Sequence, residues 1–318
     1  MIYVSLLVHE QIPVIINQLQ NFENFLCDAC VVIHVSPSAN FSSTDLAEAL
    51  AKTQLKNWRI NPVSVPSAWG SIIAAHLSNI RFIATFANEL DRIVFHSSND
   101  MLVQPGLAQY LYGKECLFNM RPVRAPGHWW VGESALSDEQ FRTLRFDVGA
   151  SAIWASQIEG SMYRLDVLRA VDQIVSQSGA LSSDVFYPRE EIFFSTLAVA
   201  LGVRSDGLPY VFSAVHRFDR ILWATLDKYR WFFSRKSKIV RSVKKRVNAR
   251  LFDSDGYRIN AKDVDLIRAR ALPDHWLSLD DGAGDSPWRI NDADGIFAVK
   301  RVERVLNDPL RQYISLLK

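Results

Sequence analysis

The chain opens with an apolar run, a helical stretch and a second apolar run, and this order constrains the fold most. Residues 2–7 and 30–35 are apolar runs of strand length. Residues 11–25 carry apolar side chains at helical spacing behind Pro13, and proline is favoured in the first turn of a helix. A strand, a helix and a strand in this order predict two parallel strands joined by a right-handed crossover.

The same order recurs further along the chain. Residues 71–87 have the spacing of an amphipathic helix and precede a buried strand at 93–96. Further elements are expected as a strand at 115–118 and helices at 165–178, 188–201 and 302–317, the last with a break near Pro309. This alternation predicts an α/β fold with a single, mainly parallel central sheet flanked by helices.

Two regions lack a clear helix or strand period. Residues 119–160 contain several prolines and glycines and the pair Trp129-Trp130. We expect long loops here, over the carboxyl edge of the sheet, where ligands bind in such folds. Residues 251–295 are rich in turn-forming residues and are expected to be irregular.

The composition limits the class and the compartment. Three cysteines are too few for a disulfide-rich secreted fold. No apolar run reaches the roughly 18 residues that a membrane-spanning helix needs. The opening residues lack the basic and small-residue pattern of a signal peptide. We therefore expect a cytoplasmic protein whose only membrane contact is peripheral, on the inner face of the cytoplasmic membrane.

The basic residues are unevenly distributed, although the formal net charge is only +2. Residues 228–250 contain ten basic residues and no acidic one, together with aromatic and aliphatic side chains. This pattern predicts a basic amphipathic helix that lies on an anionic membrane surface, and an exposed, solvated helix explains it equally well. Without a recognised nucleic-acid-binding module, it does not indicate a nucleic-acid partner.

Two common phosphate-binding motifs are missing from the sequence. No Gly-x-Gly-x-x-Gly follows the first strand and no Walker lysine is present, which disfavours a dinucleotide-dependent dehydrogenase and a P-loop ATPase. Instead a single acid, Asp100, follows the strand at 93–96, and Ser98 stands where an Asp-x-Asp motif has its first carboxylate. A divalent cation prefers several oxygen ligands. Asp100 therefore either contacts a nucleotide-sugar donor or caps a turn.

Several short blocks occur in an order known from one enzyme family. They are Val8-His9 with Val32-Ile33-His34-Val35, Trp69-Gly70-Ser71, Ser97-Ser98-Asn99-Asp100-Met101, Gly160-Ser161-Met162-Tyr163, Glu190-Glu191 through Thr196, Arg270-Ala271-Leu272 through Trp276, and Phe297-Ala298-Val299-Lys300-Arg301. Together they resemble glycosyltransferase family 14, the core-2 and I-branching β-1,6-N-acetylglucosaminyltransferases and peptide xylosyltransferases, in a bacterial-type form. Ser36 and Arg189 depart from the family, which has Asp and Pro at these places.

The resemblance implies a GT-A type nucleotide-diphospho-sugar transferase fold and an inverting transfer without a metal or other cofactor. It implies a nucleotide-sugar donor of the UDP-sugar class and a glycan or lipid-linked glycan as acceptor. Glu191 matches the catalytic base of the family, and its place in the first turn of a predicted helix favours an ionised carboxylate. Arg270 and Lys300 match the two cations that bind the donor diphosphate.

The remaining site residues are assigned on the same basis. We expect contacts to the donor nucleotide or sugar from Val8, His9, Ser36, Trp69, Ser71 and Asp100. We expect contacts to the acceptor from Trp129, Trp130, Ser161, Tyr163 and Glu190, with sugar rings stacked on the indoles.

These expectations divide the chain into three parts. Residues 1–225 form a GT-A-like catalytic core, 226–255 a basic helical segment, and 256–318 a C-terminal part that completes the donor diphosphate site. The expected function is sugar transfer in bacterial surface polysaccharide synthesis. An alternative from a different class is a catalytically silent relative that binds glycan or anionic lipid as a component of an assembly.

Overall fold

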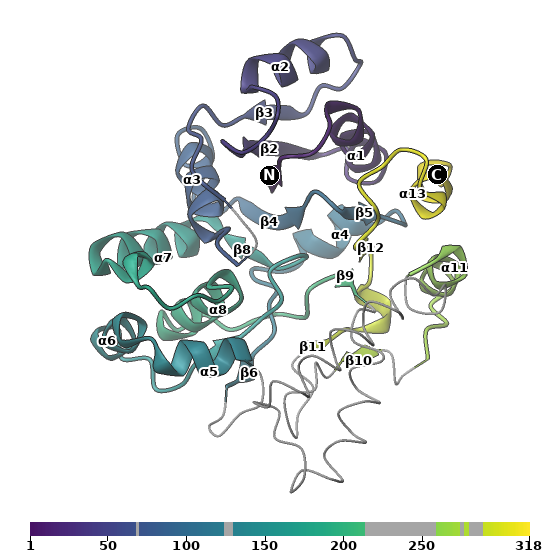
Figure 1. Ribbon diagram of the computed structural model, residues 1–318. Coiled ribbons are helices and arrows are strands. Elements are labelled where there is room, and N and C mark those ends of the chain that lie inside the picture. The colour runs from purple at the N-terminus through teal and green to yellow at the C-terminus, as the bar shows by residue number, and fades with distance from the viewer. Residues whose placement is uncertain (68–69, 124–129, 214–258, 274–276, 280–288) are drawn as a thin grey trace, which may run out of the picture.

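The first apolar run forms the central strand of a five-stranded sheet in the computed structural model (Figure 1). The strands are β1 (Ile2–Val8), β2 (Ala29–Val35), β3 (Trp58–Ile60), β4 (Arg92–Ser97) and β8 (Met162–Arg164), in the order β3-β2-β1-β4-β8. Strands β1 to β4 are mutually parallel, and β8 runs antiparallel to β4. The predicted α/β fold with a mainly parallel central sheet is therefore confirmed.

The structure describes residues 1–67, 70–123, 130–213, 259–273, 277–279 and 289–318. The predicted basic helix at 228–250 lies outside the described residues, as does the whole of the proposed middle segment at 226–255. Within the described ranges, no helix has both the length and the apolar character needed to cross a membrane.

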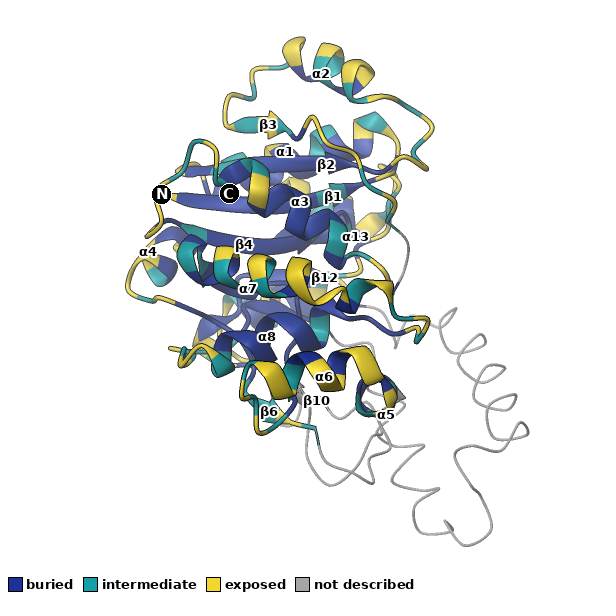
Figure 2. Cartoon of the chain, turned by 90° about the vertical axis from the view of Figure 1, so that its left-hand side faces the viewer, coloured by how far each residue is buried: buried dark blue, intermediate teal, exposed yellow. Residues whose placement is uncertain are grey.

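Helices cover both faces of the sheet (Figure 1). One face carries α3 (Ile73–Ile83), α7 (Leu165–Ser178) and α8 (Glu190–Ala200), and the other carries α1 (Ile12–Phe25) and α4 (Leu107–Tyr112). Successive side chains of a strand point to opposite faces. Accordingly, Tyr3 of β1 joins the first core, while its neighbours Ile2 and Val4 join the second. The buried residues thus lie in layers along the sheet (Figure 2).

A smaller sheet connects the C-terminal part of the chain to this core. Its strands are β5 (Asp100–Leu102), β12 (Ala298–Lys300) and β9 (Val211–Phe212), in the order β5-β12-β9. Strand β12 is antiparallel to β5 and parallel to β9, and its register pairs Lys300 with Asp100. The closing block of the sequence therefore lies beside the turn that follows β4.

Capping residues fix where several helices begin. The side chains of Ser42 and Asp45 form a capping box at α2 (Ser43–Ala51), and Asn260 and Asp263 form one at α11 (Ala261–Arg268). Asp308 caps α13 (Pro309–Ser315), whose first residue is a proline. The helix expected at 302–317 was therefore too long, because the chain ahead of Asp308 is not helical.

Both regions expected to be irregular contain short elements, so these predictions were wrong. The first holds α5 (Trp130–Ser137), α6 (Glu139–Asp147), β6 (Arg121–Pro122) and β7 (Trp154–Ala155). The second holds α11, β10 (Ser278–Leu279), β11 (Arg289–Ile290) and the short helix η2 (Ala293–Gly295). Helix α6 buries only Phe141 and Leu144, too few apolar positions to show a helical period.

Two other expected elements are shorter than predicted. The strand expected at 115–118 is reduced to an isolated bridge between Leu117 and Met162. The helix expected at 71–87 is the shorter α3. After α7 the chain forms one further short helix, η1 (Ala180–Ser182).

Candidate functional site

A cleft of about 600 Å³ opens at the carboxyl ends of β1 and β4. The chain leaves β1 toward β2 and β3 on one side, whereas β4 lies on the other side of β1. Ligands of open α/β sheets bind at such a switch in strand order. The residues that line the cleft are Leu7, Val8, His9, Ser38, Ser67, Ile72, His76, Phe95, His96, Ser97, Ser98, Asn99, Ile158, Glu159, Lys300, Arg301 and Arg304.

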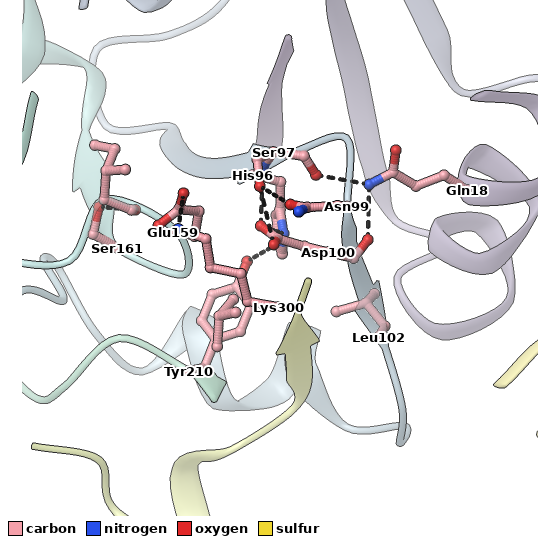
Figure 3. Close-up of polar contacts among 12 residues, drawn as sticks. Gln18, His96, Ser97, Asn99, Asp100, Leu102, Glu159, Ser161, Tyr210 and Lys300 are labelled. Atoms are coloured by element: carbon pink, nitrogen blue, oxygen red, sulfur yellow. Dashed lines mark hydrogen bonds and ion pairs between the residues drawn. The ribbon is translucent and has the colours of Figure 1, made fainter. Parts of the chain in front are cut away.

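Lys300 and Glu159 form an ion pair at this cleft (Figure 3). The pairing of β12 with β5 and β9 places Lys300 there, and its side chain is only 13% exposed. Glu159 precedes Gly160, whose φ of +76° and close approach to the backbone of Val211 leave no room for a side chain. Because the pair is largely removed from water, the attraction between its two charges is strong, and a phosphate in the cleft would compete with Glu159 for Lys300.

Arg304 forms a second cationic contact at the cleft. Its Nε lies 2.7 Å from Oε1 of Glu10 and donates to Oγ of Ser98 at 3.1 Å. The Ser98 hydroxyl donates in turn to Glu10, and the ring of His9 lies 3.2 Å from the same carboxylate oxygen. The end of β12 and the segment after it thus supply the cleft with Lys300, Arg301 and Arg304. Lys300 contacts the carboxylate of Glu159, and Arg304 contacts that of Glu10.

Asp100 is fully buried below the cleft and holds the turn that follows β4 (Figure 3). Its carboxylate accepts hydrogen bonds from the backbone N–H of Ser97 at 2.9 Å and from the Ser97 hydroxyl at 3.0 Å. Its backbone oxygen accepts a hydrogen bond from the side chain of Gln18. Of the two interpretations of Asp100, this geometry matches the turn cap, and Asp100 does not line the cleft.

The other residues assigned to the donor are distributed unevenly around the cleft. Val8 and His9 line it directly. Ser36 is buried behind it, and the hydroxyls of Ser38 and Ser67, which do line the cleft, lie 2.9 and 3.1 Å from that of Ser36. Ser71 is exposed outside the cleft lining, and Trp69 lies outside the described residues.

The two cations matched by the family resemblance are not brought together. Lys300 lines the cleft, whereas Arg270 does not. The Arg270 side chain is 65% exposed and lies 3.4 Å from Asp294. Arg301 and Arg304, which the sequence matching did not assign to the diphosphate, occupy the cleft beside Lys300 instead.

Most of the residues assigned to the acceptor lie away from the surface. The Ser161 hydroxyl is buried and donates to the backbone oxygen of Ile158. The buried ring of Tyr163 stacks on Phe118 in the core. Trp129 lies outside the described residues, as does the side chain of Trp130.

Glu190 and Glu191 begin α8, as predicted, and differ in their surroundings. Glu190 is 5% exposed, and burial raises the pKa of its carboxyl to about 8, with the negative charges of Glu191 and Glu159 adding to the effect and Lys300 opposing it. Glu191 is half-buried and does not line the cleft. Because Glu190 interacts electrostatically with Glu159 and Lys300, the start of α8 lies on their side of the cleft. A pKa of about 8 makes Glu190 mainly protonated at neutral pH and therefore a poor proton acceptor.

The raised pKa of Glu190 predicts a pH-dependent effect of Glu190→Gln on stability. Between pH 4.5, the ordinary pKa, and about pH 8, the unfolded chain loses the proton while the folded chain keeps it. Wild-type stability therefore falls through this range. Gln resembles the protonated acid and removes this loss, so the variant should gain on the order of a few kcal/mol relative to wild type between pH 5 and pH 8. Urea unfolding at both pH values measures the gain, and an equal difference at the two values would contradict the assignment.

Comparisons with known proteins give only remote structural similarity. No family model matches the chain, and no curated protein matches it in sequence. Among solved structures, 4-diphosphocytidyl-2C-methyl-D-erythritol synthase matches with 13% identity and a TM-score of 0.37, over 65% of this chain and 88% of that one. An active-site mutant of LgtC matches with 11% identity and a TM-score of 0.40, over 75% and 80%. The galactosyltransferase LgtC in complex with donor and acceptor sugar analogues matches with 11% identity and a TM-score of 0.39, over 70% of this chain and 78% of that one. Similarity this remote does not identify an activity.

Proposed function

We propose that the chain is an inverting, metal-independent glycosyltransferase that moves a sugar from a nucleotide-sugar donor to a hydroxyl of a glycan acceptor. The observation that carries this proposal is the cleft at the β1/β4 switch point, with Lys300, Arg301 and Arg304 in its lining. A diphosphate carries negative charge that increases as the bond to the sugar breaks, and cations fixed beforehand stabilise that charge. That the transferred group is a sugar is proposed from the resemblance of the sequence blocks to glycosyltransferase family 14.

In this mechanism the acceptor hydroxyl attacks the anomeric carbon from the side opposite the diphosphate. The family resemblance assigns the proton transfer to the Glu191 carboxylate at the start of α8. This carboxylate takes the hydroxyl proton, and the new carbon–oxygen bond forms as the bond to the diphosphate oxygen breaks. The electron pair of that bond leaves with the nucleoside diphosphate. Lys300, with Arg301 and Arg304 beside it, stabilises the leaving group by charge-assisted hydrogen bonds.

The proposal of metal independence is supported by the partners that the carboxylates around the cleft already have. Glu159 is paired with Lys300, Glu10 is paired with Arg304, and Asp100 is buried in its turn. A divalent cation would have to compete with these partners for its oxygen ligands.

We therefore expect sugar transfer to continue in the presence of EDTA. Initial rates are measured on protein dialysed against EDTA and compared with rates after addition of Mn²⁺ or Mg²⁺. The rates should agree within about twofold, because the cations that stabilise the leaving group are side chains. Activity that disappears in EDTA and returns only with a divalent cation would contradict metal independence.

The wider role is proposed on sequence grounds. A glycan or lipid-linked glycan as acceptor, and a place in bacterial surface polysaccharide synthesis, follow from the family resemblance. Binding of residues 228–250 to an anionic membrane surface stays a prediction, as does the peripheral location that it implies.

A further inference from the structure

His76 lies at the inner wall of the cleft, in the first turn of α3. Its side chain is almost fully buried, with 2% of the residue exposed, yet it contributes to the cleft lining. The ring packs edge-on against Phe95 of β4, with 4.8 Å between ring centroids. Its Nδ1 lies 2.9 Å from the hydroxyl oxygen of Ser5 on β1. The hydrogen bonds behind Ser5 determine which ring nitrogen carries the proton.

The orientation of these hydrogen bonds is set at one end by a backbone donor. The N–H of Val63 donates to Oδ1 of Asn61 at 2.9 Å, which identifies the oxygen of that amide. The Asn61 Nδ2 is then the donor to Oδ1 of Asn79, at 3.0 Å. This bond identifies the oxygen of the Asn79 amide, so the other terminal atom of that amide is its nitrogen, a donor.

The other end is set by a backbone acceptor. The two hydrogens of the Asn79 Nδ2 are directed to the backbone oxygen of Val32, at 3.1 Å, and to the Ser5 hydroxyl, at 3.0 Å. The Ser5 oxygen therefore accepts from Asn79 and has one proton to donate, and Nδ1 of His76 is the acceptor within reach. A neutral imidazole that accepts at Nδ1 carries its hydrogen on Nε2.

The environment keeps this imidazole neutral. Burial lowers the pKa of His76 to about 3; the Glu159 charge opposes this shift and His34 adds to it. Among the described residues, Nε2 of His76 has no hydrogen-bond partner. Ile72, Phe95 and Ile158 line the cleft together with His76. The Glu159 carboxylate, whose charge acts on the ring, also lines it and is already paired with Lys300.

We propose that the Nε2–H of His76 is a specificity-determining donor that binds a neutral acceptor oxygen of the nucleotide sugar, either a carbonyl of the base or a hydroxyl of the sugar. This inference rests on the proposed function. The phosphate charges are met by Lys300, Arg301 and Arg304, whereas an uncharged donor is suited to an uncharged oxygen. A buried donor left without its acceptor is costly, so the cleft would discriminate against ligands that lack this oxygen.

Calorimetric titration of three variants with UDP, UDP-glucose and UDP-N-acetylglucosamine tests the inference. His76→Leu removes the donor and should weaken binding by about 3- to 10-fold, the range for one neutral hydrogen bond. His76→Gln supplies an amide N–H and should restore most of the loss. His34→Gln is the matched control, because His34 is a buried imidazole on β2 outside the cleft lining. Its ligand affinities should be unchanged.

The ligands separate the two sources of the oxygen. An equal loss for UDP and for both sugars places the contact on the base, and a loss confined to the sugars places it on the sugar. Titration with pyrophosphate tests for a phosphate contact. If His76→Leu also weakens the binding of pyrophosphate, His76 contacts a phosphate and the neutral-oxygen assignment is overturned. Unchanged affinities in His76→Leu, with wild type binding normally, would overturn the inference and leave the proposed function standing.

The tautomer provides a readout that does not depend on ligand binding or activity. In ¹⁵N NMR spectra of the wild type at pH 7, the His76 ring should show a protonated Nε2 and an unprotonated Nδ1. Ser5→Ala removes the hydroxyl that fixes this state and should allow the other tautomer to be populated. A proton on Nδ1 in the wild type would overturn the inference. If the wild type binds none of the UDP ligands, a UDP-sugar donor is wrong and the inference fails with it.

Discussion

Replacement of Glu191 by Gln is expected to lower the turnover of sugar transfer by about 100-fold or more, while donor affinity stays nearly unchanged. A general base contributes roughly 10²- to 10⁴-fold to the rate, and Gln keeps the shape of the side chain but cannot accept the proton. Turnover and donor dissociation constants are measured on the same preparations, because a loss of turnover alone marks a group that acts in the chemical step.

Glu190→Gln is the matched variant for this experiment. It changes the neighbouring carboxyl in the same helical turn, which is already mainly protonated at neutral pH. Its effect on turnover should therefore be much smaller than that of Glu191→Gln. The opposite order of effects would make Glu190 the base, and near-normal turnover of Glu191→Gln would remove Glu191 from the mechanism.

The second large effect is expected on binding of the nucleoside diphosphate at Lys300. Lys300→Met alone would leave Glu159 as a buried charge without its cation, which lowers stability as well as affinity. The double variant Lys300→Met/Glu159→Gln removes both charges and isolates the effect on binding. Loss of a charge-assisted contact to phosphate should weaken UDP binding by about 10- to 100-fold, measured by calorimetry at constant ionic strength.

Arg304 and Arg270 provide the comparison. Arg304→Gln should weaken UDP binding, since Arg304 lines the cleft, whereas Arg270→Gln should have a smaller effect than the Lys300 variant, since Arg270 is exposed and lies beside Asp294. An Arg270→Gln variant that loses as much affinity as the Lys300 variant would restore the pair of cations inferred from the family resemblance. It would also show that this part of the site assignment needs revision.

The sequence predicted the central elements because their patterns are local. The apolar runs at 2–7 and 30–35 form β1 and β2. Helix α7 has the predicted bounds, because five buried aliphatic residues recur along it at helical spacing. Short elements with one or two buried side chains, such as α6, gave no comparable period. Helix α11 is marked by a capping box rather than by a long apolar stripe.

The site was predicted less completely, because tertiary contacts assemble it. Lys300 was found through a block with recognisable neighbours. Arg304 meets Glu10 and Ser98 from a distant part of the chain, and neither contact has a local signature. The proton on His76 depends on Ser5 of β1 and on the amides of Asn61, which follows β3, and Asn79 of α3. Tyr163 and Ser161 belong to a recognisable block, yet the structure uses them in the core.

Binding of nucleotide sugars to the wild-type protein in EDTA is the most direct test of the proposed function. Thermal unfolding is followed with a panel of UDP, GDP, CMP and dTDP sugars. At about 100 times its dissociation constant, a bound nucleotide sugar should raise the Tm by about 5 °C. Because its affinity should be 10- to 100-fold weaker, the double variant Lys300→Met/Glu159→Gln should show about half of this shift or less at the same ligand concentration. If no nucleotide sugar raises the Tm of the wild type, with or without Mn²⁺, the chain is not a nucleotide-sugar-dependent transferase, and a glycan- or lipid-binding role becomes the better explanation.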